Sequence, residues 1–465
     1  MKFLLFGTGD YYERYKKWFD KNQVLALLDN SPVKQQTWID EIQVVSPEQG
    51  IQLPYDVIVI LSFYVKSMKR QLLELGVAED RIYHFYEIHR LLPHLASCSW
   101  PIQYYGEAEQ IIKCPCGGRK KILLLSHDLN LGGPSLALYH GAQVLIRHGF
   151  LVVFASMIDG PLREKMVSEG IPVVVDYGLQ ACTMEEISWT GSFSFLVCDT
   201  INFYVFLSRR DTRILALWWL HDSEFFYDGV DKKLLCDLEC KNLKLAAVGP
   251  VPRKAVQKFL PDVPVANLLY GVEEEGGEEK QECRSDVPIC FVTIGYIEAR
   301  KGQDILIQAI KMMPETVRRQ AIFYLVGQDT SMMAQRLKEE IKELPQVVMT
   351  GVLGREDIDR ILNRADVFIC PSREDPMPTV AAEAMMHRVP CIISSAAGTS
   401  AYLQEKVNGM IFPNEEAGAL AEKIQWSIEN RGELQRMGIA AEKIFEDYFS
   451  MKVFERNFLE MVETV

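Results

Sequence analysis

Two carboxylates eight positions apart, Asp375 and Glu383, lie in a stretch that could bind an anionic ligand. Asp375 follows an apolar run, and Glu383 lies in an Ala- and Met-rich segment that begins after Pro378. Proline suits the start of a helix because its missing N–H would be unpaired there, so the N–H groups of Thr379 and Val380 are predicted to face the preceding loop. Such a helix end attracts anions, and we expect it to bind one here.

The carboxylate of Glu383 has two interpretations. A helical side chain leans back over the preceding turn, so Glu383 is predicted to lie over Thr379 and Val380, among small apolar residues. A carboxylate in such surroundings needs hydrogen-bond partners, which the hydroxyl groups of a ligand could supply. Alternatively, Glu383 is a charge on a solvated helix face. The residue types alone favour neither interpretation.

This stretch resembles the C-terminal lobe of the retaining glycosyltransferases of family 4, which have the two-lobed GT-B fold. That lobe carries an acidic residue, seven others and a Glu within a segment like PSxxEGFGLxxLEAM. Asp375 and Glu383 match the spacing, with Pro371-Ser372 before them and Glu383-Ala384-Met385 at the end. Asp375 stands where the family has Glu, and the adjacent Glu374 is an alternative counterpart with a shift of one residue.

Two cations, Arg300 and Lys301, follow an apolar run that ends at Gly295. In the family, a segment of the form G-R-L-x-x-x-K-G places Arg and Lys on the donor diphosphate. Lys301 matches the Lys by its spacing from Gly295, whereas Tyr296 stands at the position of the Arg, and Arg300 is an alternative source of that charge. Without the resemblance, two cations after a strand are more often part of a solvated turn.

The resemblance implies a donor site in the C-terminal lobe. Glu383 would hold the ribose, Asp375 or Glu374 would orient the sugar, and the backbone at Val352 and Leu353 would hold the base. Lys301, Arg300 and the N–H groups at the helix start would stabilise the charge that grows on the diphosphate. The donor-binding residues that the resemblance implies are Arg300, Lys301, Val352, Leu353, Glu374, Met377, Thr379, Val380 and Glu383.

Two segments nearer the N-terminus could complete the site. The apolar run at 122–125 leads to the Gly132-Gly133 turn and a helical pattern, which again makes an anion-binding end. In the family, the matching turn lies close to the donor phosphates and the acceptor. His221 ends another apolar run, where ligands collect in open α/β sheets. Family members often carry a His there that contacts the donor sugar, and ordinary hydrogen bonding to the backbone is the other interpretation of His221.

Short apolar runs alternate with helical or loop segments from residue 121 onward, which is typical of parallel sheets. We therefore predict an α/β protein. The resemblance implies two facing Rossmann-like lobes (GT-B) preceded by a small Rossmann-like domain. The predicted parts are a small domain at 1–95, a linker at 96–120, an acceptor lobe at 121–285 and a nucleotide-sugar lobe at 286–465. The acidic, glycine-broken run at 273–279 is predicted to be a hinge.

The N-terminal domain carries half of a dinucleotide-binding fingerprint. Gly7 and Gly9 follow a predicted strand, and Asp29 lies where a ribose-binding acid is expected. The third glycine is replaced by Tyr12, which hinders close approach to a pyrophosphate. A NAD site and a role in docking or oligomerisation both stay open. Because the turn is incomplete and the predicted linker is long, we expect a chain that starts near Arg119 to fold alone and to keep nucleotide-sugar hydrolysis.

The composition of the 465 residues limits the partners and the compartment. A net charge of −13 and a pI near 5.3 argue against a nucleic-acid partner and against a strongly basic membrane-binding face. No apolar run approaches the ~18 residues that span a bilayer, and the apolar start is too short for a signal peptide. We therefore expect a cytoplasmic protein, with peripheral contact at the inner membrane surface left open.

The 11 cysteines are scattered, and several lie in apolar runs, so they are predicted to be reduced core thiols. Cys114 and Cys116 form the only close pair in the sequence. A structural zinc needs four ligands, and no second pair lies at a suitable spacing. No metal site is therefore expected.

These features predict a retaining hexosyltransferase that takes a hexose-like sugar from a nucleoside diphosphate, with a UDP-sugar as the expected donor. The acceptor would be a saccharide, a lipid-linked molecule or a protein, in bacterial surface glycan synthesis. The resemblance implies no cofactor and no divalent metal, catalytic roles for Asp375, His221 and Lys301, and it is compatible with oligomers formed through residues 1–95. A noncatalytic partner subunit is the alternative, because Asp375 and Tyr296 depart from the family pattern.

Overall fold

The computed structural model describes residues 1–91, 102–114, 119–180, 187–274 and 287–463. These residues form two compact units. The first comprises residues 1–245 and 255–264, and the second comprises residues 246–254 and 265–465. Both units are built on parallel sheets, which confirms the predicted α/β class.

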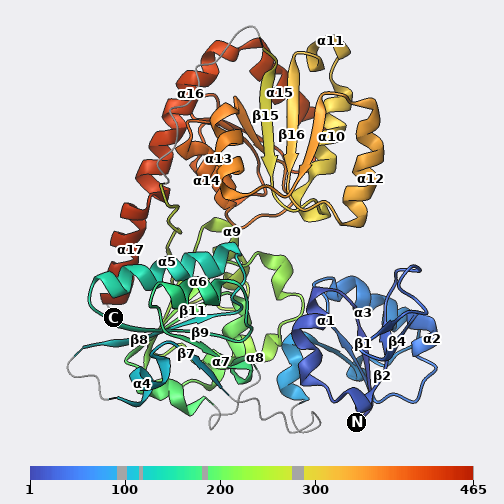
Figure 1. The fold of residues 1–465 in the computed structure, drawn as a ribbon, viewed down its shortest axis with the longest axis vertical. Coiled ribbons are helices and arrows are strands. Elements are labelled where there is room, and N and C mark those ends of the chain that lie inside the picture. Colours follow the sequence, from blue (N-terminus) through green and yellow to red (C-terminus); the bar gives the residue numbers. More distant parts are fainter. Residues whose placement is uncertain (92–101, 115–118, 181–186, 275–286, 464–465) are drawn as a thin grey trace. The chain divides into compact units, whose positions relative to one another are not determined.

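The first unit begins with a small domain whose sheet has six strands (Figure 1). The order is β3-β4-β2-β1-β5-β6, and all neighbours are parallel except β3 and β4. The strands are β1 (Phe3–Phe6), β2 (Val24–Leu28), β3 (Trp38–Ile39), β4 (Ile42–Val45), β5 (Val57–Ile60) and β6 (Ile82–His84), and the helices are α1 (Asp10–Tyr15), α2 (Pro47–Gly50) and α3 (Val65–Glu74). Central β1 and β5 are wholly apolar and buried, as strands covered on both faces must be.

A second sheet in the first unit runs in the order β13-β12-β11-β8-β9-β10-β7. Its strands are β7 (Gln103–Tyr105), β8 (Lys121–Ser126), β9 (Leu151–Ser156), β10 (Val173–Val175), β11 (Phe195–Asp199), β12 (Leu215–Leu220) and β13 (Leu243–Ala247). The helices around it are α4 (Ala108–Lys113), α5 (Gly133–Arg147), α6 (Leu162–Ser168), α7 (Tyr204–Arg209), α8 (Lys232–Cys236) and α9 (Pro250–Gln257). Because β8, β11 and β12 are parallel, their carboxyl ends share one edge of the sheet.

Part of the segment that we predicted to be a linker is structured. β7 pairs antiparallel with β10, with Tyr105 opposite Val173, and α4 follows it. The sequence signal was weak because a three-residue edge strand has no readable period. Two other predicted features are only partly described: Cys116 of the close cysteine pair and residues 275–279 of the predicted hinge lie outside the described residues.

The second unit contains a six-stranded parallel sheet in the order β17-β16-β15-β18-β19-β20. The strands of this unit are β14 (Val265–Asn267), β15 (Ile289–Ile294), β16 (Ala321–Val326), β17 (Val347–Gly351), β18 (Val367–Cys370), β19 (Cys391–Ser394) and β20 (Gly409–Phe412). Its helices are α10 (Gln303–Met312), α11 (Glu315–Arg318), α12 (Met332–Glu340), α13 (Arg355–Arg364), α14 (Thr379–Met386), α15 (Ala417–Glu429), α16 (Arg431–Ile444) and α17 (Met451–Glu463).

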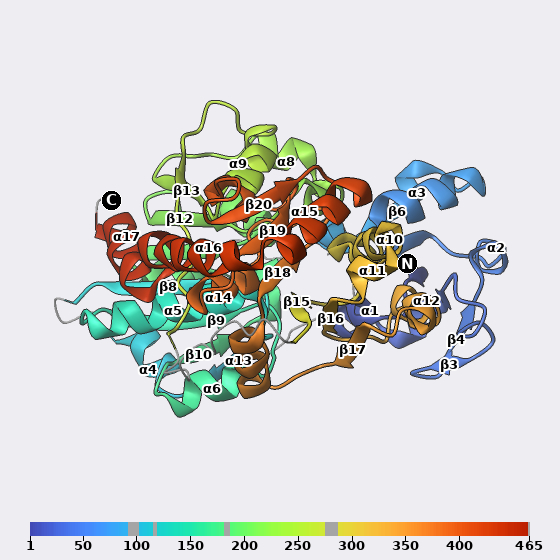
Figure 2. The same ribbon diagram turned by 90° about the horizontal axis from the view of Figure 1, so that it is seen from above.

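Helices cover both faces of this sheet. Figures 1 and 2 show α10 and α12 on one side of β15 and β16, and α13 on the other. The side chains of Ile289 and Phe291 join the core that includes α10, α12 and α15, whereas Cys290 points toward α13, because side chains alternate along a strand. Among the described residues, each helix is too short or too polar to cross a bilayer.

Candidate functional site

In the second unit, α14 begins at Thr379, with Pro378 as its N-cap rather than its first residue. No side chain caps this helix end. The first N–H groups of a helix have no partner within the helix, so those of Thr379 and Val380 are available to an anion. The predicted strand, loop and helix are thus all present around residues 367–386.

The loop before α14 holds an ion pair. The Nζ of Lys301 donates to Oδ2 of Asp375 at 2.7 Å, and the Oγ of Ser372 lies 3.4 Å from the same oxygen. Asp375 is buried, and its backbone carbonyl accepts the N–H of Gly398. Because β15 and β18 are neighbours in the sheet, the loops that follow them bring Lys301 and Asp375 together.

Lys301, Asp375 and Val380 line one small pocket, together with Thr293, Gln303 and Pro378. Its volume is about 10 Å³, close to what a single water needs. Three residues that the sequence assigned to the site therefore meet at one point. The pocket can hold one oxygen atom of a phosphate or hydroxyl group between the cation, the carboxylate and the helix start.

Arg300 and Glu374 tie two loops together instead of lining this pocket. The Nη1 of Arg300 donates to the backbone oxygen of Glu374 at 3.2 Å, and its Nη2 donates to Glu298 at 3.0 Å. Of the two adjacent acidic residues, Asp375 has the carboxylate beside Lys301. This geometry favours Asp375 over Glu374 as the residue that would face a sugar.

Glu383 has a protein partner that the sequence analysis did not identify. Its Oε1 accepts a hydrogen bond from Nη1 of Arg355, the first residue of α13, at 2.8 Å. The Glu383 side chain is 13% exposed. It is therefore neither surrounded only by apolar groups nor part of a fully solvated helix face. Arg355 lies 28 residues away in the sequence, and no local pattern connects the two.

The remaining predicted donor residues differ in exposure. Val352, directly after β17, is 74% exposed, and Leu353 is partly buried. Met377 is buried, and its Sδ accepts a hydrogen bond from Thr399 at 3.5 Å. The Met377 side chain therefore packs inside the protein, so any contact with a donor would come from its backbone.

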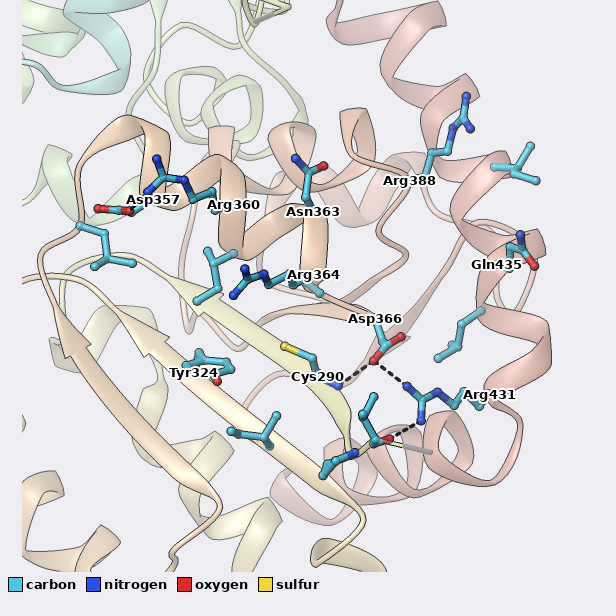
Figure 3. A pocket seen from close by; sticks show the side chains of 18 residues that line it. Cys290, Tyr324, Asp357, Arg360, Asn363, Arg364, Asp366, Arg388, Arg431 and Gln435 are labelled. Carbon is cyan, nitrogen blue, oxygen red and sulfur yellow. Dashed lines mark hydrogen bonds and ion pairs between the residues drawn. The ribbon is translucent and has the colours of Figure 1, made fainter. Parts of the chain in front are cut away.

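The second unit also holds a larger pocket, of about 880 Å³, between the sheet, α13 and α16 (Figure 3). Leu353 is the one predicted site residue in its lining. Three of its arginines are in ion pairs: Arg360 with Asp357 at 2.8 Å, Arg388 with Glu442 at 2.8 Å and Arg431 with Asp366 at 3.5 Å. Lys301, Asp375 and Glu383 are not in this lining.

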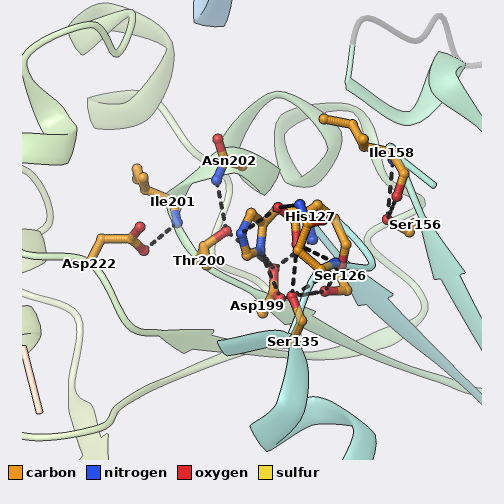
Figure 4. Close-up of polar contacts among 12 residues, drawn as sticks. Ser126, His127, Ser135, Ser156, Ile158, Asp199, Thr200, Ile201, Asn202 and Asp222 are labelled. Atoms are coloured by element: carbon orange, nitrogen blue, oxygen red, sulfur yellow. Dashed lines mark hydrogen bonds and ion pairs between the residues drawn. The ribbon is translucent and has the colours of Figure 1, made fainter. Parts of the chain in front are cut away.

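In the first unit, a buried polar cluster lies at the carboxyl ends of β8 and β11 (Figure 4). Asp199 is fully buried and accepts hydrogen bonds from Oγ of Ser126 at 2.8 Å and from the backbone N–H of His127 at 3.0 Å. The Nδ1 of His127 lies 3.1 Å from Asp199. His127 and Asp199 were not among the predicted site residues, although Asp199 ends β11 and His127 directly follows β8 at the same edge of the sheet.

The charges of this cluster are shifted by burial and by each other. Burial opposes the charge on His127, but the carboxylates of Asp128 and Asp199 outweigh it and raise the pKa of His127 to about 9. Burial raises the pKa of Asp222 to about 7 and lowers the pKa of His221 to about 3. The cluster therefore holds one cationic and one neutral imidazole at neutral pH. Such shifts are common at functional sites.

His221 directly follows β12 and is buried. The centre of its ring lies 4.6 Å from the centre of the Trp219 ring. Its Nε2 is buried and has no hydrogen-bond partner among the described residues. A buried polar atom without a partner costs stability, so a ligand contact would relieve that cost. This atom is the feature of His221 that fits the functional interpretation.

The Gly132-Gly133 turn starts α5, as predicted. Gly132 is the N-cap, no side chain caps the helix, and both glycines are exposed. Ser135, in the first helical turn, donates to Oδ1 of Asp128 at 3.1 Å. The turn thus presents free N–H groups beside the His127 cluster.

The glycine turn of the N-terminal domain is filled by protein groups. Asp29, at the position of a ribose-binding acid, accepts hydrogen bonds from the side chain of Thr8 and the backbone N–H of Ser31. Lys34 also lies 3.4 Å from Asp29. Tyr12, in place of the third glycine, is buried and donates to Asp40 at 3.0 Å. These contacts favour a structural role over a NAD site.

Residues 278–444 match the family model described as "Glycosyl transferases group 1". The matched residues make up less than half of the chain. Residues 1–83 match a second model, "C2185-like, N-terminal". The first match contains the Lys301–Asp375 pair, α14 and Glu383, so the residues that carry the predicted resemblance lie inside it.

Two curated relatives of the chain have names that refer to bacterial glycan synthesis. The lipopolysaccharide glucosyltransferase WaaG of Escherichia coli K12 is 23% identical over 240 residues, which cover 51% of this chain and 60% of WaaG. The putative teichuronic acid biosynthesis glycosyltransferase TuaC of Bacillus subtilis 168 is 30% identical over 156 residues, 32% of this chain and 37% of TuaC. The chain thus matches less than two thirds of the length of either relative.

Solved structures show the same fold. Anabaena Alr3699/HepE, solved with UDP and glucose, superposes with a TM-score of 0.62 at 18% identity, over 75% of this chain and 100% of that one. WaaG superposes with a TM-score of 0.57 at 14% identity, over 74% and 100%. The chain therefore has the GT-B fold that the resemblance implied, with an additional N-terminal domain.

Proposed function

We propose that the protein is a retaining glycosyltransferase that transfers a hexose-like sugar from a nucleoside diphosphate. The ion pair of Lys301 and Asp375 beside the uncapped start of α14 carries this proposal. It lies inside the residues that match the group 1 glycosyltransferase model, and retention of configuration rests on the resemblance to family 4. A UDP-sugar is the expected donor, because HepE has been solved with UDP and with UDP-glucose.

The second unit would bind the donor and stabilise the leaving group. The bond from the sugar to the diphosphate breaks, and negative charge develops on the phosphate oxygen. Lys301 and the N–H groups of Thr379 and Val380 are oriented cations and dipoles for that charge. Asp375 would hold Lys301 in place and accept a hydroxyl group of the sugar. Glu383, already held on one oxygen by Arg355, would bind the ribose through the other.

The first unit would supply the acceptor side. The Nε2 of His221 is the buried polar atom that a sugar hydroxyl could satisfy, and the Gly132-Gly133 turn offers free N–H groups. The acceptor is proposed to be a saccharide, a lipid-linked molecule or a protein in bacterial surface glycan synthesis, as the names of WaaG and TuaC suggest. The proposed chemistry uses no metal and no cofactor.

A noncatalytic partner subunit remains the second candidate. Tyr296, at the position of the family Arg, is 62% exposed and brings no charge to the diphosphate. Asp375 is also one methylene shorter than the family Glu. Either change could weaken catalysis while the fold persists.

Calorimetric titration with UDP, GDP and dTDP, followed by hydrolysis assays with the matching sugar nucleotides, separates the two candidates. The enzyme is expected to bind one nucleoside diphosphate and to release its sugar slowly to water. Lys301→Ala should slow release roughly 10² to 10³-fold, and replacement of Lys311, an exposed lysine of α10, by Ala should not. Absence of any release or transfer with every acceptor tested would favour the partner subunit, and absence of nucleotide binding would refute the enzyme.

A further inference from the structure

The N-terminal domain packs directly against the rest of the first unit. The hydroxyl of the buried Tyr204 in α7 donates to the backbone oxygen of Tyr86 at 3.0 Å. The ring of buried His84 is so close to Gly229 that a Cβ there would meet Nδ1 at 2.1 Å. The ring of Phe63 lies 5.1 Å from that of Phe226. This packing argues against the expectation that the chain from residue 119 onward folds alone.

One charged residue of the N-terminal domain reaches the polar cluster. The Nη1 of Arg14, in α1, lies 3.2 Å from Oδ2 of Asp128. The Arg14 side chain is 27% exposed, whereas that of Asp128 is 5% exposed. Burial raises the pKa of Asp128, but His127 and Arg14 outweigh it and hold that pKa below its usual value. Arg14 thus helps to keep a buried carboxylate charged.

Asp128 in turn fixes the turn that starts α5. Its Oδ1 accepts the backbone N–H of Asn130 at 3.0 Å and the hydroxyl of Ser135 at 3.1 Å, and its Oδ2 accepts the Asn130 side chain at 2.8 Å. Asn130 and Ser135 stand on either side of the Gly132-Gly133 turn. The one carboxylate therefore anchors both ends of a turn whose own residues are exposed.

We propose that Arg14 of the N-terminal domain is a positioning residue for the acceptor side: it holds Asp128, and through Asp128 it holds the Gly132-Gly133 turn. The kinetic part of this inference rests on the proposed function. A charged, hydrogen-bonded carboxylate is a stronger acceptor than a neutral one, so the loss of one of its two cations loosens both anchors of the turn. The N-terminal domain then contributes to activity without binding a nucleotide.

Hydrogen–deuterium exchange in the full chain tests this positioning at the amides of Asn130 and Leu136, which donate to Oδ1 of Asp128 and to the backbone oxygen of Gly132. Arg14→Ala should speed their exchange at least tenfold, Arg14→Lys should restore most of the protection, and Arg70→Ala, an exposed arginine of the same domain, should change nothing. Unchanged exchange in Arg14→Ala overturns the proposal. So does a loss of cooperative unfolding, because Arg14 would then act on folding as a whole.

A double-mutant cycle tests the route through Asp128. In the Asp128→Asn background, Arg14→Ala should add little further exchange, since residues that act through one contact are not additive. Full additivity would mean that Arg14 acts elsewhere, and it would overturn the inference. This result does not depend on any substrate.

Kinetics with UDP-glucose as the probe separate the inference from the proposed function. Arg14→Ala should lower kcat for UDP-glucose hydrolysis about tenfold with KM within twofold, because the donor would bind to the second unit. Equal kcat in Arg14→Ala and Arg70→Ala overturns the kinetic part of the inference. UDP binding by the unmodified chain reports the proposed function alone, so its absence would refute that function while the exchange result still decides the role of Arg14.

Discussion

The Nζ of Lys301 and the Oδ2 of Asp375 are 2.7 Å apart, although 73 residues lie between them in the sequence. Each follows a strand of the same sheet, and both side chains are largely buried, at 19% and 7% exposure. A buried cation that is already held by a carboxylate needs little reorganisation when a second anion arrives. This pair is therefore suited to stabilise charge that appears during a reaction.

The first prediction concerns this pair. Lys301→Ala should lower the rate of donor turnover roughly 10² to 10³-fold, the usual scale for the loss of one oriented stabilising group. Single-turnover kinetics measure the chemical step. The matched control is Lys311→Ala, whose exposed side chain pairs with Glu340 on the surface. Turnover of Lys301→Ala at the rate of the unmodified protein would exclude Lys301 from the site.

The second prediction concerns Glu383. As a ribose ligand it makes charged hydrogen bonds worth roughly 1.5 to 3 kcal/mol each, so Glu383→Ala should weaken UDP binding at least tenfold. Binding of pyrophosphate, which has no ribose, should hardly change, and calorimetry can compare the two ligands. Arg355→Ala should weaken UDP binding less, because it removes only the residue that orients Glu383. If Glu383→Ala bound UDP as tightly as the unmodified protein, the only role of Glu383 would be its ion pair with Arg355.

The third prediction concerns pH. The pKa of His127 is raised to about 9 in the folded protein, above ~6.5 in the unfolded chain, so its stabilising effect is complete below pH ~6.5 and is lost as pH rises through 9. The free energy of unfolding of the unmodified protein should exceed that of His127→Gln by about 1 to 3 kcal/mol at pH 6, and the excess should vanish by pH 10. Urea titrations across this range measure the difference. A difference in unfolding free energy that does not change with pH would show that Asp128 and Asp199 do not raise the pKa of His127.

The fourth prediction concerns the N-terminal domain. A chain that starts near residue 119 loses the partners of Tyr204 and Phe226 and leaves Asp128 without Arg14. Exposed aromatic surface and the loss of one of the two cations beside a buried carboxylate both destabilise, so the truncated chain should unfold at a lower temperature or aggregate. Differential scanning calorimetry of both chains provides the comparison. A truncated chain with an unchanged transition would show that the domain is an independent module.

The sequence by itself determined the local units. Apolar runs that alternate with helical segments fixed the parallel sheets, because a buried strand must be apolar along its whole length. The spacing of Asp375 and Glu383, with Pro378 between them, fixed the loop and the start of α14, because cap and periodicity signals act over a few residues. These are short-range rules, and they were sufficient for the fold class and for the group 1 resemblance.

The tertiary structure alone decided which of these residues meet. Three contacts join residues that are far apart in the sequence. Glu383 and Arg355 are 28 positions apart, His127 and Asp199 are 72 apart, and Asp128 and Arg14 are 114 apart. Such pairs depend on the order of strands in a sheet and on the packing of one domain against another, and no local pattern encodes either. The choice of Asp375 over Glu374 has the same origin, because adjacent residues point in different directions and only the folded loop decides which carboxylate faces Lys301.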